Sequence, residues 1–226
     1  LTLSEFAQQD QRINRSSELP LMVDADHGYG NALNVKRTVE ELEMAGVSGM
    51  SIEDTELPQP FGSVGCTKLL SIPEGVGKMK AALDGRQDPN LIIAGRTSAP
   101  GVTNMEDALE RAMAYEKVGV DAIFLVGVKT KEQLEKISDA ISIPIILGGG
   151  GSSDMMDLDY LSAKNVRICL QGHQPFSAAV KAIYDTMKAL REGTPTEELQ
   201  GIASAELMGK VTKNNDYEDM FDKYLK

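Results

Sequence analysis

The chain has little cysteine, little histidine and no long apolar run, and each shortage argues against a class of protein. Its two cysteines, Cys66 and Cys169, are too few for a disulfide framework, and neither lies in a close Cys/His cluster of zinc-ligand spacing. No apolar run approaches the roughly 18 to 20 residues of a membrane span, and no signal-peptide pattern begins the sequence. We therefore expect a cytoplasmic protein with reduced thiols.

Basic residues are also in the minority. The chain has 23 lysines and arginines against 34 aspartates and glutamates, which gives a formal net charge of -11. This charge opposes non-specific attraction to nucleic acid or to an anionic membrane, so we expect neither as a partner. With 226 residues, of which 42% are hydrophobic, the chain can bury a full core.

Short apolar runs alternate with helical patterns along the chain. The runs are nearly all apolar, which is typical of strands buried on both faces of a parallel sheet. Helical spacing follows at Val35, Val39 and Leu42, and capping signals at Ser71 and Thr130 predict two further helices. The six predicted strands cover residues 19–23, 49–52, 91–95, 122–127, 143–147 and 166–170.

A repeated βα order fits either a doubly wound sheet or a (β/α)8 barrel. Polar residues follow several of the apolar runs directly, and in a barrel such positions converge on one mouth. We therefore predict an α/β fold of the TIM-type barrel class over residues 1–192. Because a barrel needs eight strands, we expect the first one or two to lie upstream of this sequence. A predicted C-terminal helical tail over residues 193–226 begins with a Gly-Thr-Pro break.

Three acids, Asp24, Asp26 and Glu53, fall at the ends of adjacent predicted strands. Carboxylates brought so close repel one another unless a cation or protons neutralise them. Oxygen ligands without a Cys or His cluster indicate Mg²⁺ or Mn²⁺. The alternative is that these acids cap the helices that follow.

Arg96 and His173 are the other candidate site residues, and both follow a buried run. The Arg96 guanidinium would bind a substrate carboxylate in a bidentate way, or form a salt bridge to one of the same acids. His173 stands in "QGHQPF", between a predicted strand and a helix, whereas His27 belongs to a turn in which Gly28 and Gly30 let the backbone bend.

Two glycine-rich segments are weaker signals. Residues 147–153 offer backbone N–H groups to an anion, or form a plain loop between strand and helix. Residues 60–68 read as a mobile lid over the barrel mouth. Cys66 in that lid is a reactive thiol or an unperturbed surface cysteine.

The motifs together resemble one family. "VDADHGYGNALNV", "AGVSGMSIEDTELPQPFG", "GRTSA" and "QGHQPF" are similar to the phosphoenolpyruvate mutase/isocitrate lyase superfamily, and most closely to its oxaloacetate decarboxylase branch. The likeness runs from about Leu1 to about Arg191. A D-x-D-x-G-Y-G turn followed about 27 residues later by I-E-D makes it specific.

The resemblance implies a lyase of the barrel fold. It implies Mg²⁺ held by Asp24, Asp26 and Glu53, and Arg96 bound to the carboxylate of a 2-oxo acid. A histidine at the place of His173 is typical of the decarboxylase branch. The implied reaction converts oxaloacetate, or a close 2-oxo dicarboxylic acid, to pyruvate and CO₂ through a metal-stabilised enolate. Family members also associate as homotetramers, dimers of dimers with exchanged C-terminal helices.

Some segments depart from the family pattern and leave alternatives open. The predicted lid lacks the lysine pair and histidine of the lyases, which argues against cleavage of isocitrate or methylisocitrate. "GRTSA" has serine where asparagine is common, and "ILGGGG" lacks the tyrosine-bearing loop of the decarboxylases. The alternatives are a carbon–carbon lyase or phosphonate mutase acting on a related 2-oxo acid, and a non-catalytic barrel that binds a small acid.

Overall fold

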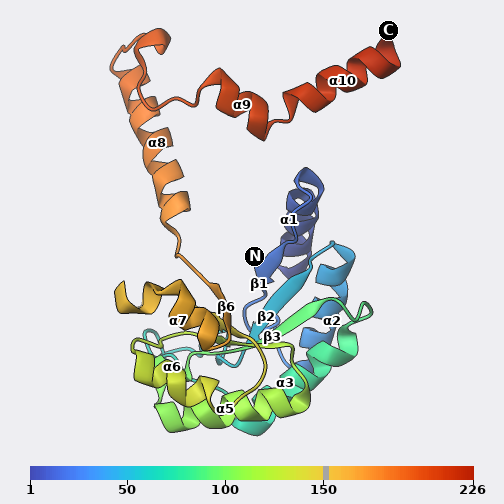
Figure 1. The fold of residues 1–226 in the computed structure, drawn as a ribbon, viewed down its shortest axis with the longest axis vertical. Coiled ribbons are helices and arrows are strands. Elements are labelled where there is room, and N and C mark those ends of the chain that lie inside the picture. The colour runs from blue at the N-terminus through green and yellow to red at the C-terminus, as the bar shows by residue number, and fades with distance from the viewer. Residues whose placement is uncertain (150–152) are drawn as a thin grey trace. The chain divides into compact units, whose positions relative to one another are not determined.

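The predicted βα repeat is present in the computed structural model, which describes residues 1–149 and 153–226. All pairings in its sheet are parallel, and the strands follow one another in chain order. They curl into an open half-barrel with helices outside (Figure 1). Each predicted run overlaps one strand: β1 Met22–Asp24, β2 Gly49–Glu53, β3 Ile92–Thr97, β4 Ala122–Leu125, β5 Ile145–Leu147 and β6 Val166–Cys169.

The helices begin where the sequence supplies a capping side chain. Ser71 accepts a hydrogen bond from the Glu74 N–H, and Thr130 forms a reciprocal capping box with Gln133, as predicted. Gly46 follows the end of α2 with φ +89°, a left-handed conformation that favours glycine. The helices before residue 172 are α1 Leu3–Ser16, α2 Ala32–Met44, α3 Ile72–Gly85, α4 Ala99–Val102, α5 Met105–Val118, α6 Lys131–Ser138 and α7 Leu158–Ala163, with a 3₁₀ turn at Ser153–Met156.

The core lies between the sheet and the outer row of helices, in which α2 packs on α3, α3 on α5 and α5 on α6. Each of these helices sends fully buried side chains inward, among them Leu42, Met79, Tyr115 and Leu134. Such burial is the main source of stability in a sheet of short strands. Tyr115 fits because Gly75 faces it: a Cβ at Gly75 would come within 2.3 Å of the Tyr115 hydroxyl oxygen.

The inner face of the sheet departs from the prediction that every strand is buried on both faces. Ile92 and Ile168 remain 42% and 40% exposed, beside a hollow of about 380 Å³ lined mainly by apolar side chains. The reason is topological, because β1 and β6 are the two edges of the sheet and the inner face stays open between them. The prediction of full burial is wrong at these positions.

The chain divides into two compact units, Leu1–Gly172 and His173–Lys226. The second unit contains α8 Gln174–Arg191, a 3₁₀ turn at Thr196–Glu198, α9 Ala205–Val211 and α10 Asn214–Leu225. The domain boundary predicted at residue 192 stays a prediction.

Two further sequence interpretations concern membrane-spanning helices and the glycine-rich loop at residues 147–153. Across the described residues, no helix has the length and apolar character that a membrane crossing requires. The anion-binding loop predicted over residues 147–153 includes residues 150–152, which lie outside the described residues.

Candidate active site at the carboxyl ends of the strands

The strand register brings four of the predicted site residues together at the carboxyl ends of β1, β2 and β3. Asp24 is paired with Ser51 of β2, and Glu53 at the end of β2 is paired with Arg96 of β3. Asp26 follows β1 by two residues, and its carbonyl accepts a hydrogen bond from the Glu53 N–H at 2.8 Å. The predicted convergence of these residues at the strand ends follows from this register.

Arg96 lies between two of the acids. Its guanidinium forms an ion pair with Asp24, and its Nη2 lies 3.1 Å from Glu53 Oε2. The same guanidinium stacks over the Phe124 ring, with 5.1 Å from Cζ to the ring centroid. The salt bridge that the sequence offered as one role of Arg96 is therefore present, and its binding of a substrate carboxylate stays a prediction.

Glu53 is the most buried of the three acids, with 7% of its side chain exposed against 50% for Asp24. Burial raises the pKa of the Glu53 carboxyl, because desolvation disfavours the charged form. The positive charge of Arg96 lowers this pKa, whereas the negative charges of Asp24 and Asp26 raise it. The Glu53 carboxylate is thus attracted by Arg96 and repelled by both aspartates, and the predicted grouping of the three acids around a cation stays a prediction.

Asp26 is presented by a turn with unusual backbone geometry. Its φ is +49° and that of Tyr29 is +60°, a left-handed conformation that costs a non-glycine residue free energy. Gly28 has φ +73°, and a Cβ there would lie 2.4 Å from the Val35 side chain, so glycine is required. The predicted use of glycine to bend this turn is confirmed.

Two buried side chains from the outer helices hold this turn in place. The Thr38 hydroxyl of α2 donates to the Gly28 carbonyl at 3.0 Å, and Lys78 of α3 donates to the His27 carbonyl at 2.7 Å. Burial lowers the pKa of the Lys78 ammonium group, and nearby acids, Glu74 first, oppose the change. Sequence reasoning missed both anchors, because their helical spacing is that of ordinary core positions.

The alternative role of the acids as helix caps is wrong. Asn31 caps α2 and Ser71 caps α3, so Asp24, Asp26 and Glu53 have no such function. Arg96 compensates part of the negative charge of Asp24 and Glu53, and no ion pair is seen for Asp26 among the described residues.

The donor set fits a hard divalent cation in its chemistry. All three side chains offer carboxylate oxygens, and a guanidinium already lies between two of them. In residues 1–149 and 153–226, no three His, Cys, Asp or Glu side chains lie close enough together to hold a metal ion. The three-ligand set therefore stays a prediction.

His173 is the N-cap residue of α8 and is exposed. It belongs to the second compact unit, whereas the acids and Arg96 belong to the first. Its predicted catalytic role stays a prediction.

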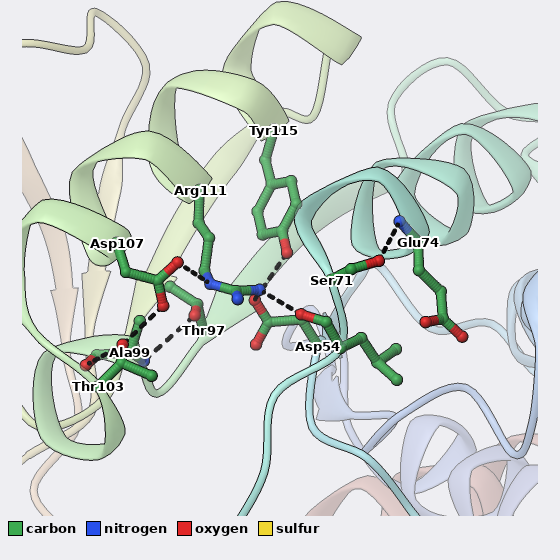
Figure 2. A network of polar contacts seen from close by, with 10 residues as sticks. Asp54, Ser71, Glu74, Thr97, Ala99, Thr103, Asp107, Arg111 and Tyr115 are labelled. Carbon is green, nitrogen blue, oxygen red and sulfur yellow. Dashed lines mark hydrogen bonds and ion pairs between the residues drawn. The ribbon is translucent and has the colours of Figure 1, made fainter.

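A second cluster of polar side chains, Asp54, Arg111 and Tyr115, lies next to these strand ends and was not among the predicted site residues. Asp54, fully buried next to Glu53, accepts hydrogen bonds from Arg111 Nη1 at 2.9 Å and from the Tyr115 hydroxyl at 2.7 Å. Figure 2 shows Arg111 and Tyr115 pointing from α5 toward Asp54. Burial raises the pKa of the Asp54 carboxyl, and both partners oppose this change. The available sequence signal was the four-residue spacing of Asp107, Arg111 and Tyr115.

Residues 1–191 match the phosphoenolpyruvate phosphomutase family. The chain belongs to this family. The predicted resemblance to the phosphoenolpyruvate mutase/isocitrate lyase superfamily is thereby confirmed.

Relatives of known name and structure extend this likeness. An oxaloacetate decarboxylase of Rhodopseudomonas palustris (strain BisB18) is 57% identical over 213 residues, which are 94% of this chain and 73% of the relative. The structure of phosphonopyruvate hydrolase in complex with oxalate and Mg²⁺ has a TM-score of 0.84 and 26% identity, over 100% of this chain and 80% of that one. Oxaloacetate acetylhydrolase in complex with 3,3-difluorooxalacetate has a TM-score of 0.82 and 26% identity, over 99% and 77%. The predicted α/β barrel class and the likeness to the decarboxylase branch are confirmed.

Proposed function

We propose that this chain is a cytoplasmic lyase that decarboxylates oxaloacetate, or a close 2-oxo dicarboxylic acid, to pyruvate. The bond between the methylene carbon and the distal carboxyl group breaks, and CO₂ leaves. The electron pair stays on the carbon and oxygen atoms that become pyruvate, and a proton from solvent completes the product. The observation that carries the proposal is the 57% identity to an oxaloacetate decarboxylase across 94% of the chain.

We propose Mg²⁺ as the cofactor, with Mn²⁺ as the alternative, held by Asp24, Asp26 and Glu53. The oxygen donors of these residues and the presence of Mg²⁺ in the related phosphonopyruvate hydrolase structure support this choice. When bound, such a cation supplies positive charge that draws electrons away from the bond that breaks.

Arg96 has the geometry to bind and orient the acid. Its guanidinium is a planar fork suited to a carboxylate, and only 18% of its side chain is exposed. Its Nε is buried without a hydrogen-bond partner among the described residues, so Arg96 keeps one donor unused. The Phe124 ring on its face restricts its orientation. We propose that Arg96 exchanges part of its contact with the acids for the substrate carboxylate.

His173 is proposed as a hydrogen-bond donor to the oxo group or to the departing carboxylate. An imidazole ring can donate a hydrogen bond from a ring nitrogen, which suits both tasks. The support for this role is the "QGHQPF" segment, because the family match extends through it to residue 191.

The deciding experiment measures CO₂ and pyruvate release from oxaloacetate with Mg²⁺, above the reaction of the metal alone. Asp26→Ala and His173→Ala are compared with Asp84→Asn, which changes an exposed acid of α3 and serves as the matched control. Loss of rate in the first two variants only would support the proposal. A protein with no rate above background would instead be tested for phosphonate cleavage, for carbon–carbon cleavage of related 2-oxo acids, and for binding of oxalate without turnover.

We also propose that the chain forms a homo-oligomer, a dimer of dimers, through its C-terminal helices. On α8, Phe176, Ile183, Tyr184 and Met187 are each more than 60% exposed, and their spacing places them along one face of the helix. An exposed apolar face of this kind is typical of a subunit contact. Light scattering gives the subunit number, and a monomer at micromolar concentration would refute the proposal.

A further inference from the structure

The segment between β2 and α3 leaves the sheet beside the site and returns to it through a short neck. The neck consists of residues 54–56 and 68–70, and the tip of residues 57–67 lies between them. The Leu70 N–H donates to the Asp54 carbonyl at 2.8 Å, and the Glu56 N–H donates to the Lys68 carbonyl at 2.8 Å. Thr55 and Leu69 form an antiparallel bridge. The two strands of the neck are therefore paired, but over three residues only.

The tip is largely exposed, and only Leu57 and Ser63 in it are partly buried. Phe61 and Val64 are at least 90% exposed, and a Cβ at Gly62 or Gly65 would meet no atom within 4 Å. A two-stranded ladder as short as this neck is marginal on its own. The position of the tip therefore depends on what else fixes the neck.

One buried side chain contacts both strands of the neck. Arg111 Nη1 donates to the Asp54 carboxylate on the outgoing strand and to the Leu70 carbonyl on the returning strand, each at 2.9 Å. Its Nε is held by Asp107 at 3.0 Å, one turn earlier on α5. With 7% of its side chain exposed, Arg111 makes these bonds away from most solvent, where charge-assisted hydrogen bonds are strong (Figure 2).

The same group is joined directly to the site. Asp54 follows Glu53 in the chain, and the Asp54 N–H donates to the Arg96 carbonyl at 3.2 Å. Tyr115, fully buried on α5, donates to Asp54 Oδ2 at 2.7 Å, the carboxylate oxygen that also accepts from Arg111. Any displacement of the Asp54 main chain would thus be passed to Glu53 and Arg96.

We propose that Arg111 is a positioning residue that clamps the two strands of the neck and so fixes the place from which the tip leaves the strand ends. This inference rests on the proposed function for its catalytic consequence, because the tip would then help retain the substrate acid. The clamp itself is a property of the folded chain and needs no substrate.

The test is hydrogen exchange of the neck amides in Arg111→Gln, without substrate or metal. Loss of a hydrogen bond to a charged group is expected to speed exchange at the Glu56 and Leu70 amides about tenfold or more. Arg86→Gln is the matched control. Arg86 also bonds one carboxylate and one carbonyl, Asp121 at 2.7 Å and Leu91 at 2.9 Å, at the opposite ends of the strands. Arg86→Gln is expected to leave exchange at the neck unchanged.

Tyr115→Phe keeps the ring and removes only the bond to Asp54, so it serves if Arg111→Gln does not fold. It is expected to speed exchange at Leu70, whose N–H bonds the Asp54 carbonyl. Equal exchange at the neck in Arg111→Gln and Arg86→Gln would overturn the clamp. So would unchanged exchange in Tyr115→Phe if that is the only variant that folds.

Kinetics then separate the clamp from the proposed function. Arg111→Gln is expected to raise KM for oxaloacetate about tenfold, whereas a mere loss of folded enzyme lowers kcat and leaves KM unchanged. Arg111→Lys, which keeps the charge, is expected to give an intermediate KM. Neck exchange that responds in a protein without decarboxylase activity would refute the proposed function and leave the clamp standing. An unchanged KM in an active, folded Arg111→Gln enzyme would overturn the positioning role.

Discussion

Arg96 on β3 and Glu53 on β2 are register partners, and their side chains meet with 3.1 Å between Nη2 and Oε2. Asp24, one strand further along, contacts the same guanidinium. The Arg96 guanidinium thus connects carboxylates from two neighbouring strands at their carboxyl ends. A 2-oxo acid brings a carboxylate of its own, and the fork of Arg96 suits it equally well.

Arg96→Lys and Arg96→Ala should separate charge from fork geometry. Lysine keeps the charge beside Glu53, so we expect Arg96→Lys to unfold near the wild-type urea midpoint while kcat/KM for oxaloacetate falls about 100-fold. Arg96→Ala should lower both the urea midpoint and kcat/KM, because Glu53 is left buried without its ion pair. The control is Arg37→Ala, which removes an exposed pair with Glu41. Wild-type kcat/KM in Arg96→Lys would contradict a bidentate role.

Asp26 is expected to matter for metal dependence more than for stability. It is exposed and its backbone is left-handed, so Asp26→Asn keeps the fold and relieves repulsion with Glu53. We expect the Mg²⁺ concentration for half-maximal activity to rise about tenfold or more, and EDTA to abolish wild-type activity. Titration of activity with Mg²⁺ checks this, with Asp84→Asn as the control. Activity that persists in EDTA would exclude the proposed cofactor.

The sequence was sufficient to predict the sheet and the polar residues at the carboxyl ends of its strands. Continuous apolar runs indicated buried parallel strands, and polarity directly after them located Asp24, Asp26, Glu53 and Arg96. Strand order in a βα repeat then brings those positions together, so no long-range information was needed.

The residues that support this edge could not be found in the same way. Arg111 and Lys78 lie at helical core spacing, and their roles depend on which carbonyl or carboxylate faces them across the fold. Such pairings are tertiary, and the four-residue spacing of Asp107, Arg111 and Tyr115 on α5 does not reveal them. The open inner face at Ile92 was also missed, because an apolar run does not reveal whether both faces of its strand are covered.

Asp10 gives a pH dependence that is independent of the site. It is 2% exposed on α1, its Oδ2 has no hydrogen-bond partner in the described part of the chain, and burial raises its pKa to about 6. Since the folded pKa lies above the ordinary aspartate value of 3.8, the folded state binds the proton more tightly than the unfolded state. Ionisation of Asp10 therefore lowers the free energy of unfolding. This loss is absent below about pH 4, grows as pH rises to about 6, and is constant above that.

We accordingly expect Asp10→Asn to raise the free energy of unfolding at pH 7.5 by at most about 3 kcal/mol. The gain should shrink steadily as pH falls from 6 toward 4. Urea unfolding at several pH values measures it, and exposed Asp84→Asn should show no such trend. A gain that is the same at pH 4.5 and pH 7.5 would mean that Asp10 is not desolvated.

Two glycines of α3 test the packing around Tyr115. A Cβ at Gly75 would lie 2.3 Å from the Tyr115 hydroxyl oxygen, whereas a Cβ at Gly77 would meet no atom within 4 Å. Alanine in a helix is favoured over glycine by about 1 kcal/mol, so Gly77→Ala should raise the free energy of unfolding by up to that amount. Gly75→Ala has the same helix preference but must displace a hydroxyl bonded to Asp54 at 2.7 Å.

We therefore expect Gly75→Ala to lower the free energy of unfolding by about 1 to 3 kcal/mol, in the range of other overpacked cores. Urea unfolding of both variants checks the opposite signs. Because Tyr115 cannot retreat without moving Asp54, the amides of the neck should exchange faster in Gly75→Ala and not in Gly77→Ala. Equal stabilisation in the two variants would show that the Tyr115 ring yields freely, and Asp54 would then owe its position to Arg111 alone.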